Sequence, residues 1–340
     1  MARRAGWSSA VTLVFAVALG ATLSGQDRAP ANAANKTAAA GGAASRPGPV
    51  PRTPDGHPDF QGRWTNGTYT PFERPDEFAT KEFFTVAEAE AYAKRRNDQL
   101  LGQSRDAVHY DDAIWQSEPS GAKGLSTLRT SLVVEPKNGK LPPLNAEGQR
   151  RADELAATRK KTDQFASAQS RPLAERCIMW PHEGPPMLPA GYFPNLEIVQ
   201  SPGQVAVLQE ITHNARIIPV DAGSHIAKSI RQYAGNSRAH WEGDTLVVEN
   251  TNFNSLTQFR GASEQMVVVE RFTMVDADNI KYEFTVTDPA TWDTPWKAEV
   301  PLKRTPDPVF EYACHEGNYG MQNILRAKRV EEAKAKAGTQ

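Results

Sequence analysis

The sequence predicts a mainly β protein, a single antiparallel meander that closes or nearly closes into a barrel and carries a few flanking helices. Two segments alternate apolar and polar residues, NIKYEFTVTDP (279–289) and PWKAEVPLKR (295–304), as half-buried antiparallel strands do. The predicted strands follow one another too closely to leave room for crossover helices. About ten such strands must stack as two sheets or close on themselves, because open edges favour aggregation. A two-sheet sandwich is the alternative.

The N-terminal segment predicts export. Arg3 and Arg4 precede an apolar run at 10–23 that small residues follow, which is the pattern of a cleaved signal peptide and is too short for a membrane span. We assign residues 1–25 to this signal. Residues 26–51 are rich in alanine, glycine and proline and are expected to form a disordered tether. A single β-rich domain at 52–335 and a flexible tail at 336–340 complete the predicted organisation.

The remaining elements follow from local patterns. The tight-turn sequences SPGQ (201–204), EGD (242–244) and DADN (276–279) separate short strands. A helix is expected at 87–101, where Thr85 and Glu88 form a capping box, and two more at 146–160 and 321–335. Strands are expected at 59–69, 128–136, 196–200, 205–210, 216–220, 245–250, 266–274, 279–289, 295–304 and 309–313.

The first predicted strand carries a motif of known barrels. Phe60-x-Gly62-x-Trp64 is similar to the Gly-x-Trp signature that opens calycin (lipocalin-like) barrels. The resemblance implies that Trp64 plugs the closed end of a barrel and stacks under an arginine from the last strands. Arg304, at the end of its strand, is the residue that we expect in this role.

Longer motifs resemble a large group of exported bacterial proteins. These motifs are TPDGHPDFQGRW (53–64), WEGDTLVVENTNFN (241–254) and YACHEGNYGM (312–321), which match the patterns TPDGxPDxxGxW, WEGDTLVVExTNFN and YxCHEGNYGM. The resemblance implies export, one domain and a β-rich fold. It implies no particular reaction, so the chemistry must be argued from the residues.

Charge and missing motifs exclude several classes of function. The net charge is −1 and no basic block is present, so nucleic acid and anionic membrane surfaces are poor partners. After the signal no apolar run approaches the length of a membrane span. The sequence also lacks a Gly-x-Ser-x-Gly elbow, a phosphate-binding glycine loop, a dinucleotide fingerprint, a His-Glu-x-x-His helix and a haem-attachment motif.

The chain has only two cysteines, Cys177 and Cys314, and in an exported protein they most simply form a disulfide. A zinc site that combines them with nearby histidines is the alternative. Each cysteine is followed by the tripeptide His-Glu-Gly. A disulfide would bring these two tripeptides into one small volume.

The two tripeptides supply the candidate catalytic residues His315, Glu316, His182 and Glu183. In an acid–base site His315 would be the base, and Glu316 or Glu183 would orient it. The same four residues could hold a divalent metal through His182 and His315, although no cofactor is favoured. The structural alternative is that both tripeptides are turns, since glycine follows each pair.

A second set of candidates lies in EITHNARIIPVDAGSH (210–225). His213 could face a cavity mouth, with Arg216 orienting an anionic or carbonyl group. The alternative is an ion pair between Glu210 and Arg216 across the strand ladder, with no ligand.

Aromatic residues gather in the C-terminal half, where most are expected to form the core. Trp292 and Trp296, in a proline-stiffened loop, are the candidates for a pocket rim, and Trp241 and Tyr312 are further candidates for ligand contact.

These patterns favour a periplasmic or secreted protein that binds a small, partly apolar molecule in the barrel cavity. The first alternative is a hydrolase or lyase that uses acid–base catalysis in the same cavity. The second is a scaffold protein of the cell envelope. The identity of the ligand and the oligomeric state are left open.

Overall fold

The computed structural model describes residues 49–101, 127–190, 192–257 and 259–338. The predicted signal peptide and nearly all of the predicted tether lie outside these residues. Within the described part, no helix is long and apolar enough to cross a membrane.

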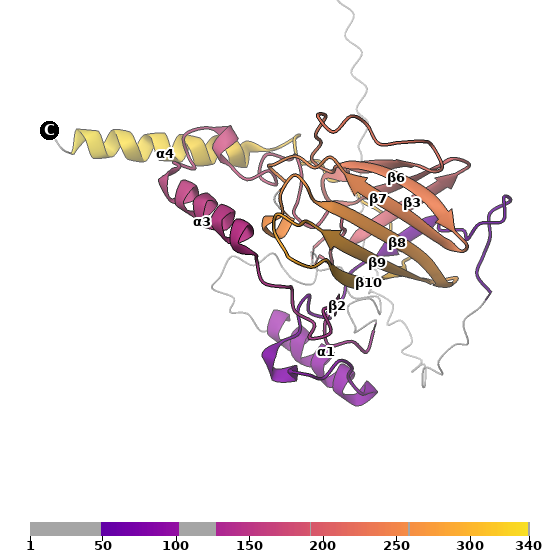
Figure 1. Cartoon of the computed structure of the whole chain (residues 1–340). Helices are drawn as coiled ribbons and strands as arrows, with labels where there is room; N and C mark the ends of the chain where they lie inside the picture. Colours follow the sequence, from indigo (N-terminus) through magenta and orange to yellow (C-terminus); the bar gives the residue numbers. More distant parts are fainter. Residues whose placement is uncertain (1–48, 102–126, 191, 258, 339–340) are drawn as a thin grey trace, which may run out of the picture. The chain divides into compact units, whose positions relative to one another are not determined.

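Ten strands form one antiparallel sheet, in the order β5-β4-β3-β1-β10-β9-β8-β7-β6, with β2 paired to β10 off this path (Figure 1). From β3 to β5 and from β6 to β10, strands that follow one another in sequence pair with one another. β1 joins these two runs by pairing with both β3 and β10. The bounds are β1 (Gly62–Thr65), β2 (Val133–Glu135), β3 (Asn195–Ser201), β4 (Gln204–Gln209), β5 (Ala215–Pro219), β6 (Asn236–Glu242), β7 (Thr245–Thr251), β8 (Val267–Asp276), β9 (Asn279–Thr287) and β10 (Trp296–Arg304).

The sheet is a nearly closed barrel with one unsealed seam. Beyond the end of β5, a single parallel bridge joins Val220 to Ala239 of β6, and the Asp221 N–H donates to the Ala239 carbonyl at 2.8 Å. The prediction of a closed or nearly closed antiparallel barrel is therefore confirmed.

The Gly-x-Trp motif closes the barrel as its resemblance implies. Trp64 is fully buried, its indole N–H donates to the Phe60 carbonyl at 2.9 Å, and the Arg304 guanidinium lies 4.3 Å from its ring centroid. Gly62 has φ +125°, and a Cβ there would lie 2.4 Å from Arg304 Nη1. Only glycine fits this conformation so close to the arginine.

Large side chains fill the barrel interior. Alternate residues of β8, β9 and β10 are buried, as the period-two pattern predicts. Seven of the inward side chains leave no volume between them that a water molecule could occupy; they are Phe60, Ile198, Val205, Val207, Ile218, Leu246 and Phe272. At this place the interior is core and not the ligand cavity that the sequence led us to expect.

Among the described residues, three α-helices flank the barrel: α1 (Val86–Leu101), α3 (Ala146–Lys161) and α4 (Tyr319–Ala337). The predicted capping box of α1 forms, because Glu88 accepts the Thr85 N–H at 2.8 Å and Thr85 accepts the Glu88 N–H at 3.3 Å. Asn145 caps α3 and anchors it to the turn after β9 by donating to the Pro289 carbonyl at 2.9 Å.

Two predictions about strands were wrong. The segment 309–313 is not a strand, because its backbone finds a side-chain partner: the Phe310 N–H donates to Glu210 Oε1 at 3.0 Å. Of the expected strand 128–136 only β2 forms. Conversely, the sequence analysis missed β6, whose residues NSRAHWE lack the β-branched character of its neighbours.

Candidate functional site

The predicted disulfide is present. Cys177 and Cys314 are bonded, with their Cα atoms 5.7 Å apart. The Asn318 side-chain amide reinforces this junction, because it donates to the Glu175 carbonyl at 3.0 Å and to Cys177 Sγ at 3.3 Å, while its carbonyl caps α4. The bond thus ties the loop before β3 to the start of α4.

The disulfide does not make the two His-Glu pairs into one site. His315 and Glu316 are exposed, and no hydrogen bond or ion pair of the described residues joins them to His182 or Glu183. Among those residues no group of three histidine, cysteine or acidic side chains could hold a metal ion. His315 and Glu316 lie in the turn just before α4, where the structural alternative placed them.

Glu183 is buried, with 3% of its surface exposed. Its carboxylate accepts the Trp180 N–H at 2.7 Å and the Thr212 hydroxyl. Burial raises the pKa of Glu183 from 4.5 to about 7, and the bond from Trp180 opposes this only in part. The carboxyl group therefore changes its charge near neutral pH.

His182 is shifted in the opposite direction. Burial lowers its pKa to about 4, so its imidazole is neutral at pH 7. Its Nε2 atom is buried without a hydrogen-bond partner among the described residues, and so is Nε1 of Trp180, whose ring centroid lies 5.8 Å away. Buried polar atoms without partners cost about 1–3 kcal/mol each, so such a pair calls for a functional explanation.

The same loop enters the barrel. Met187 is fully buried in the main core, and its N–H donates to Tyr282 Oη at 2.9 Å. Tyr282 in turn donates to Glu270 at 2.6 Å. The segment Glu183–Met187 is buried throughout, so it links the barrel interior to the outer wall that His182 forms.

Arg216 points into the barrel and pairs with Glu270, not with Glu210 as the sequence suggested. Its Nη2 donates to Glu270 Oε1 at 3.1 Å, and Glu270 is fully buried. Glu210 instead accepts the backbone of Phe310. His213 is exposed in η3 (Ile211–His213), between β4 and β5, so the structure does not bring His213 and Arg216 to a common cavity mouth.

The aromatic candidates are mainly structural. Trp292 and Trp296 are 3% and 0% exposed and pack edge to face at 5.8 Å, so they are core residues and not a rim. Trp241 stacks on His57 at 4.2 Å. Tyr312 packs against Phe193 at 5.2 Å.

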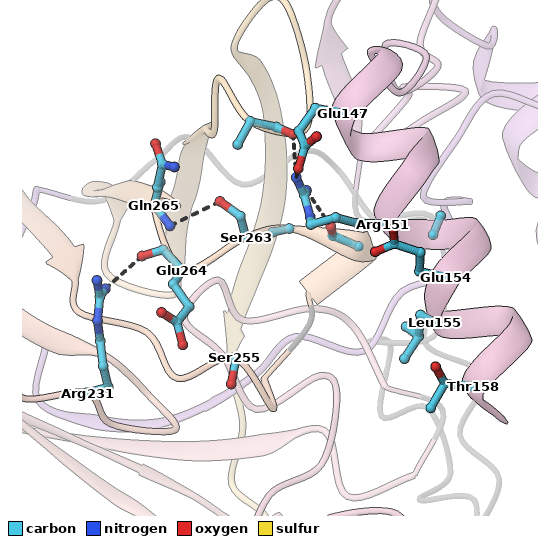
Figure 2. A pocket seen from close by; sticks show the side chains of 14 residues that line it. Glu147, Arg151, Glu154, Leu155, Thr158, Arg231, Ser255, Ser263, Glu264 and Gln265 are labelled. Atoms are coloured by element: carbon cyan, nitrogen blue, oxygen red, sulfur yellow. Dashed lines mark hydrogen bonds and ion pairs between the residues drawn. The ribbon is translucent and has the colours of Figure 1, made fainter. Parts of the chain in front are cut away.

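Two grooves of the described residues share α3 as a wall, and Leu155 lines both. The first, which we call the polar groove, has a volume of about 650 Å³ and lies between α3 and the segment 255–265 (Figure 2). Charges of both signs line it, from Glu147, Glu154, Glu264, Arg151 and Arg231.

The arginines of the polar groove form hydrogen bonds that hold neighbouring segments of the protein together. Arg151 donates to the Ala290 carbonyl and to Thr291 Oγ1, both at 2.6 Å, which fastens α3 to the turn after β9. Arg231 donates to the Glu264 carbonyl at 2.7 Å (Figure 2). We therefore treat this groove as a packing boundary of α3.

The second groove, which we call the arginine groove, has a volume of about 730 Å³. Its walls are α3, the loop at 169–189 and the segment 256–260. Arg159, Arg171, Arg176 and Arg260 line it, and no aspartate or glutamate does among the described residues. Trp180 and His182 lie in its wall, so the groove contains two of the three described residues whose buried nitrogen atoms have no hydrogen-bond partner; the third is Trp296 in the core.

The sequence analysis found His182 but not the groove. The arginines are spread over 102 residues of sequence, 159 to 260, and no local pattern connects them. The proline content of the loop was the available signal: Pro172, Pro181, Pro185, Pro186 and Pro189 lie within 18 residues, which predicts a stiff loop with little regular structure.

No protein-family model matches the chain, and no curated protein matches it. Among solved structures it is similar to a secretory abundant heat soluble protein from Ramazzottius varieornatus, at 11% sequence identity and a TM-score of 0.23. The match covers 33% of this chain and 70% of that one. The resemblance to the group of exported bacterial proteins stays a prediction.

Proposed function

We propose that this protein binds a small, partly apolar molecule outside the barrel, in the arginine groove. The observation that supports this most is the groove itself. Its volume of about 730 Å³ falls within the range of about 300–1,000 Å³ that is usual for small-molecule sites. The barrel interior, in contrast, is packed with side chains at the place described above.

The lining of the groove suits such a ligand. Apolar side chains come from all three walls: Leu155, Leu173, Met179, Trp180, Leu188, Leu256 and Phe259. Phe259 is anchored because its ring stacks on that of Trp296 in the core at 6.0 Å. Prolines and the disulfide restrict the remaining wall, so the site is largely formed before a ligand arrives and less conformational entropy is lost on binding.

We also propose that the protein is periplasmic or secreted. The disulfide supports this, since such bonds persist in oxidising compartments. The predicted signal peptide supports it independently at the level of the sequence.

A blocking substitution tests the binding proposal. Leu256 lines the groove and is 53% exposed, so Leu256→Trp should fill the groove without disturbing the core. Val330 on α4 is 47% exposed and does not line the groove, so Val330→Trp is a matched control. The neutral dye N-phenyl-1-naphthylamine should bind the native protein and Val330→Trp saturably, with a rise in fluorescence, but not Leu256→Trp.

Equal binding of the dye to Leu256→Trp would place the site elsewhere. Failure of the native protein to bind the dye would contradict the proposal. In that case the packed barrel would favour a scaffold protein of the cell envelope.

A second candidate function, an acid–base hydrolase or lyase, is favoured by His182 and Glu183. Burial moves their pKa values in opposite directions, as it does in many acid–base pairs. His182 lines the arginine groove, whereas Glu183 lies behind it. Turnover of a p-nitrophenyl ester that Glu183→Gln and His182→Gln each abolish, with unchanged melting temperature, would support this activity.

A further inference from the structure

We infer that the ligand of the arginine groove is an amphiphilic anion, with one carboxylate, sulfate or sulfonate group on an apolar body. This inference rests on the proposed function, because it names the ligand class of the same groove.

The permanently charged side chains that line the arginine groove are all positive. Four guanidinium groups from α3, from the 169–189 loop and from the 256–260 segment line the groove, without a carboxylate among its described lining residues. The polar groove on α3 has three glutamates and two arginines. Since the whole chain has a net charge of only −1, the excess of positive charge is a local property of this groove. A cationic ligand would be repelled there.

Not all four arginines are available to a ligand. Arg171 is neutralised by Glu175, to which it donates two hydrogen bonds at 2.6 and 3.0 Å. Arg176 differs, because its guanidinium makes no hydrogen bond or ion pair with any residue that the structure describes. Arg176 follows Glu175 directly and precedes Cys177, so the disulfide fixes its backbone.

Arg260 supplies a second cation from another wall of the groove. Its guanidinium lies 4.5 Å from the Phe72 ring centroid, a cation–π contact that orients it without neutralising its charge. It has no carboxylate partner among the described residues. Arg260 adopts φ +53° within η4 (Phe259–Gly261), a backbone conformation that residues other than glycine rarely adopt.

Two arginines from different walls of one groove suit an oxyanion. A guanidinium group offers several N–H donors in one plane, which match two oxygen atoms of a carboxylate or sulfate. The unpartnered nitrogen atoms of Trp180 and His182 add two possible donors in the same wall. Both nitrogen atoms are buried, so a ligand could bond to them only after the protein atoms that shield them from solvent had moved. The apolar side chains between the arginines would take the rest of the molecule.

A series of ligands with the same chain and different head groups tests the inference. Dodecanoate and dodecyltrimethylammonium, each below its micelle concentration, and dodecanol, below its solubility limit, would compete with N-phenyl-1-naphthylamine. We expect dodecanoate to displace the dye at a concentration at least about tenfold lower than dodecanol, since a charge-assisted hydrogen bond contributes at least that factor. Dodecyltrimethylammonium should be the weakest competitor, and added salt should weaken dodecanoate alone.

Arginine variants assign the effect to the groove. Arg176→Gln and Arg260→Gln should each weaken dodecanoate about tenfold and leave dodecanol unchanged. Arg326→Gln, an exposed arginine of α4 outside the groove, should change neither. Arg176→Lys keeps the charge and should retain part of the affinity, which separates loss of charge from loss of structure.

The outcomes distinguish the two proposals. If dodecanol or dodecyltrimethylammonium competes as well as dodecanoate, and Leu256→Trp still blocks the dye, the ligand is not an anion although the groove is the site. Unchanged dodecanoate affinity in both arginine variants would also overturn the inference. If Leu256→Trp leaves dye binding intact, the proposed function fails with it.

Discussion

Glu183→Gln is expected to change how the stability of the protein depends on pH. The pKa of Glu183 is raised from 4.5 to about 7 in the folded chain, so between these values the folded state binds a proton more tightly than the unfolded state. Its contribution to stability is therefore complete below pH 4.5 and is lost as the pH rises through 7. At about 1.4 kcal/mol for each pH unit, the loss is about 3 kcal/mol.

His182 opposes this trend. Its pKa is lowered from 6.5 to about 4, so the stability that it contributes is present above pH 6.5 and is lost as the pH falls through 4. Between pH 4.5 and 6.5 the two contributions have opposite slopes of similar size and largely cancel. Glutamine at position 183 removes the contribution of Glu183, so the pH dependence that His182 causes can be measured alone.

The assay is urea denaturation at pH 4 to 8, followed by tryptophan fluorescence. Glu183→Gln should match the native protein near pH 4 and exceed its free energy of unfolding by up to about 3 kcal/mol at pH 8. Glu316→Gln is the matched control, since Glu316 occupies the same position in the second His-Glu-Gly tripeptide but is exposed, and its effect should not vary with pH in this way. A Glu183→Gln difference that is constant from pH 4 to 8, or that shrinks as the pH rises, would refute the reasoning.

Three further substitutions probe the framework. Cys177→Ser with Cys314→Ser should lower the free energy of unfolding by up to about 5 kcal/mol, because the bond closes a loop with a sequence separation of 137; a loss below about 1 kcal/mol would show that the loop is fixed by packing alone. Arg216→Met should cost about 3–5 kcal/mol by leaving the buried Glu270 without its ion-pair partner, and adding Glu270→Gln should restore part of it, because the amide is neutral and its oxygen can still accept from Tyr282 Oη. Gly62→Ala should cost about 1–3 kcal/mol, because φ +125° is a strained conformation for any residue with a Cβ; an unchanged melting temperature would contradict the need for glycine at this position.

The barrel could be predicted because its determinants are local or pairwise. The period-two patterns of β9 and β10 and the glycine-containing turns appear within a few residues of sequence. The Gly62–Trp64 motif needed only one distant partner, Arg304, and the disulfide needed only two cysteines. In each case few alternative pairings of residues were possible.

The candidate site could not be predicted in the same way. Whether Arg216 pairs with Glu210 or with Glu270 depends on which face of β5 is turned inward, and both choices satisfy the local pattern. His315 resembles His182 in sequence, but only His182 is carried inward by a loop that ends in the buried Met187. Burial, which gives His182 and Glu183 their shifted pKa values, is a property of the folded chain and not of the tripeptide.

The packing of the barrel also explains why we propose a binding site outside it. Ten strands with aromatic residues at inward positions, such as Trp64, Tyr282 and Phe284, fill the space that a wider barrel would leave for a ligand. Binding residues must then come from the connections, which are free to vary without disturbing the sheet. The loop at 169–189 meets this need because Met187 anchors it in the core while its proline-rich outer part forms the groove. A ligand that shifted the Trp180 backbone would disturb the hydrogen bond from its N–H to the Glu183 carboxylate, so the proposed binding would be expected to alter the pKa of this carboxyl group.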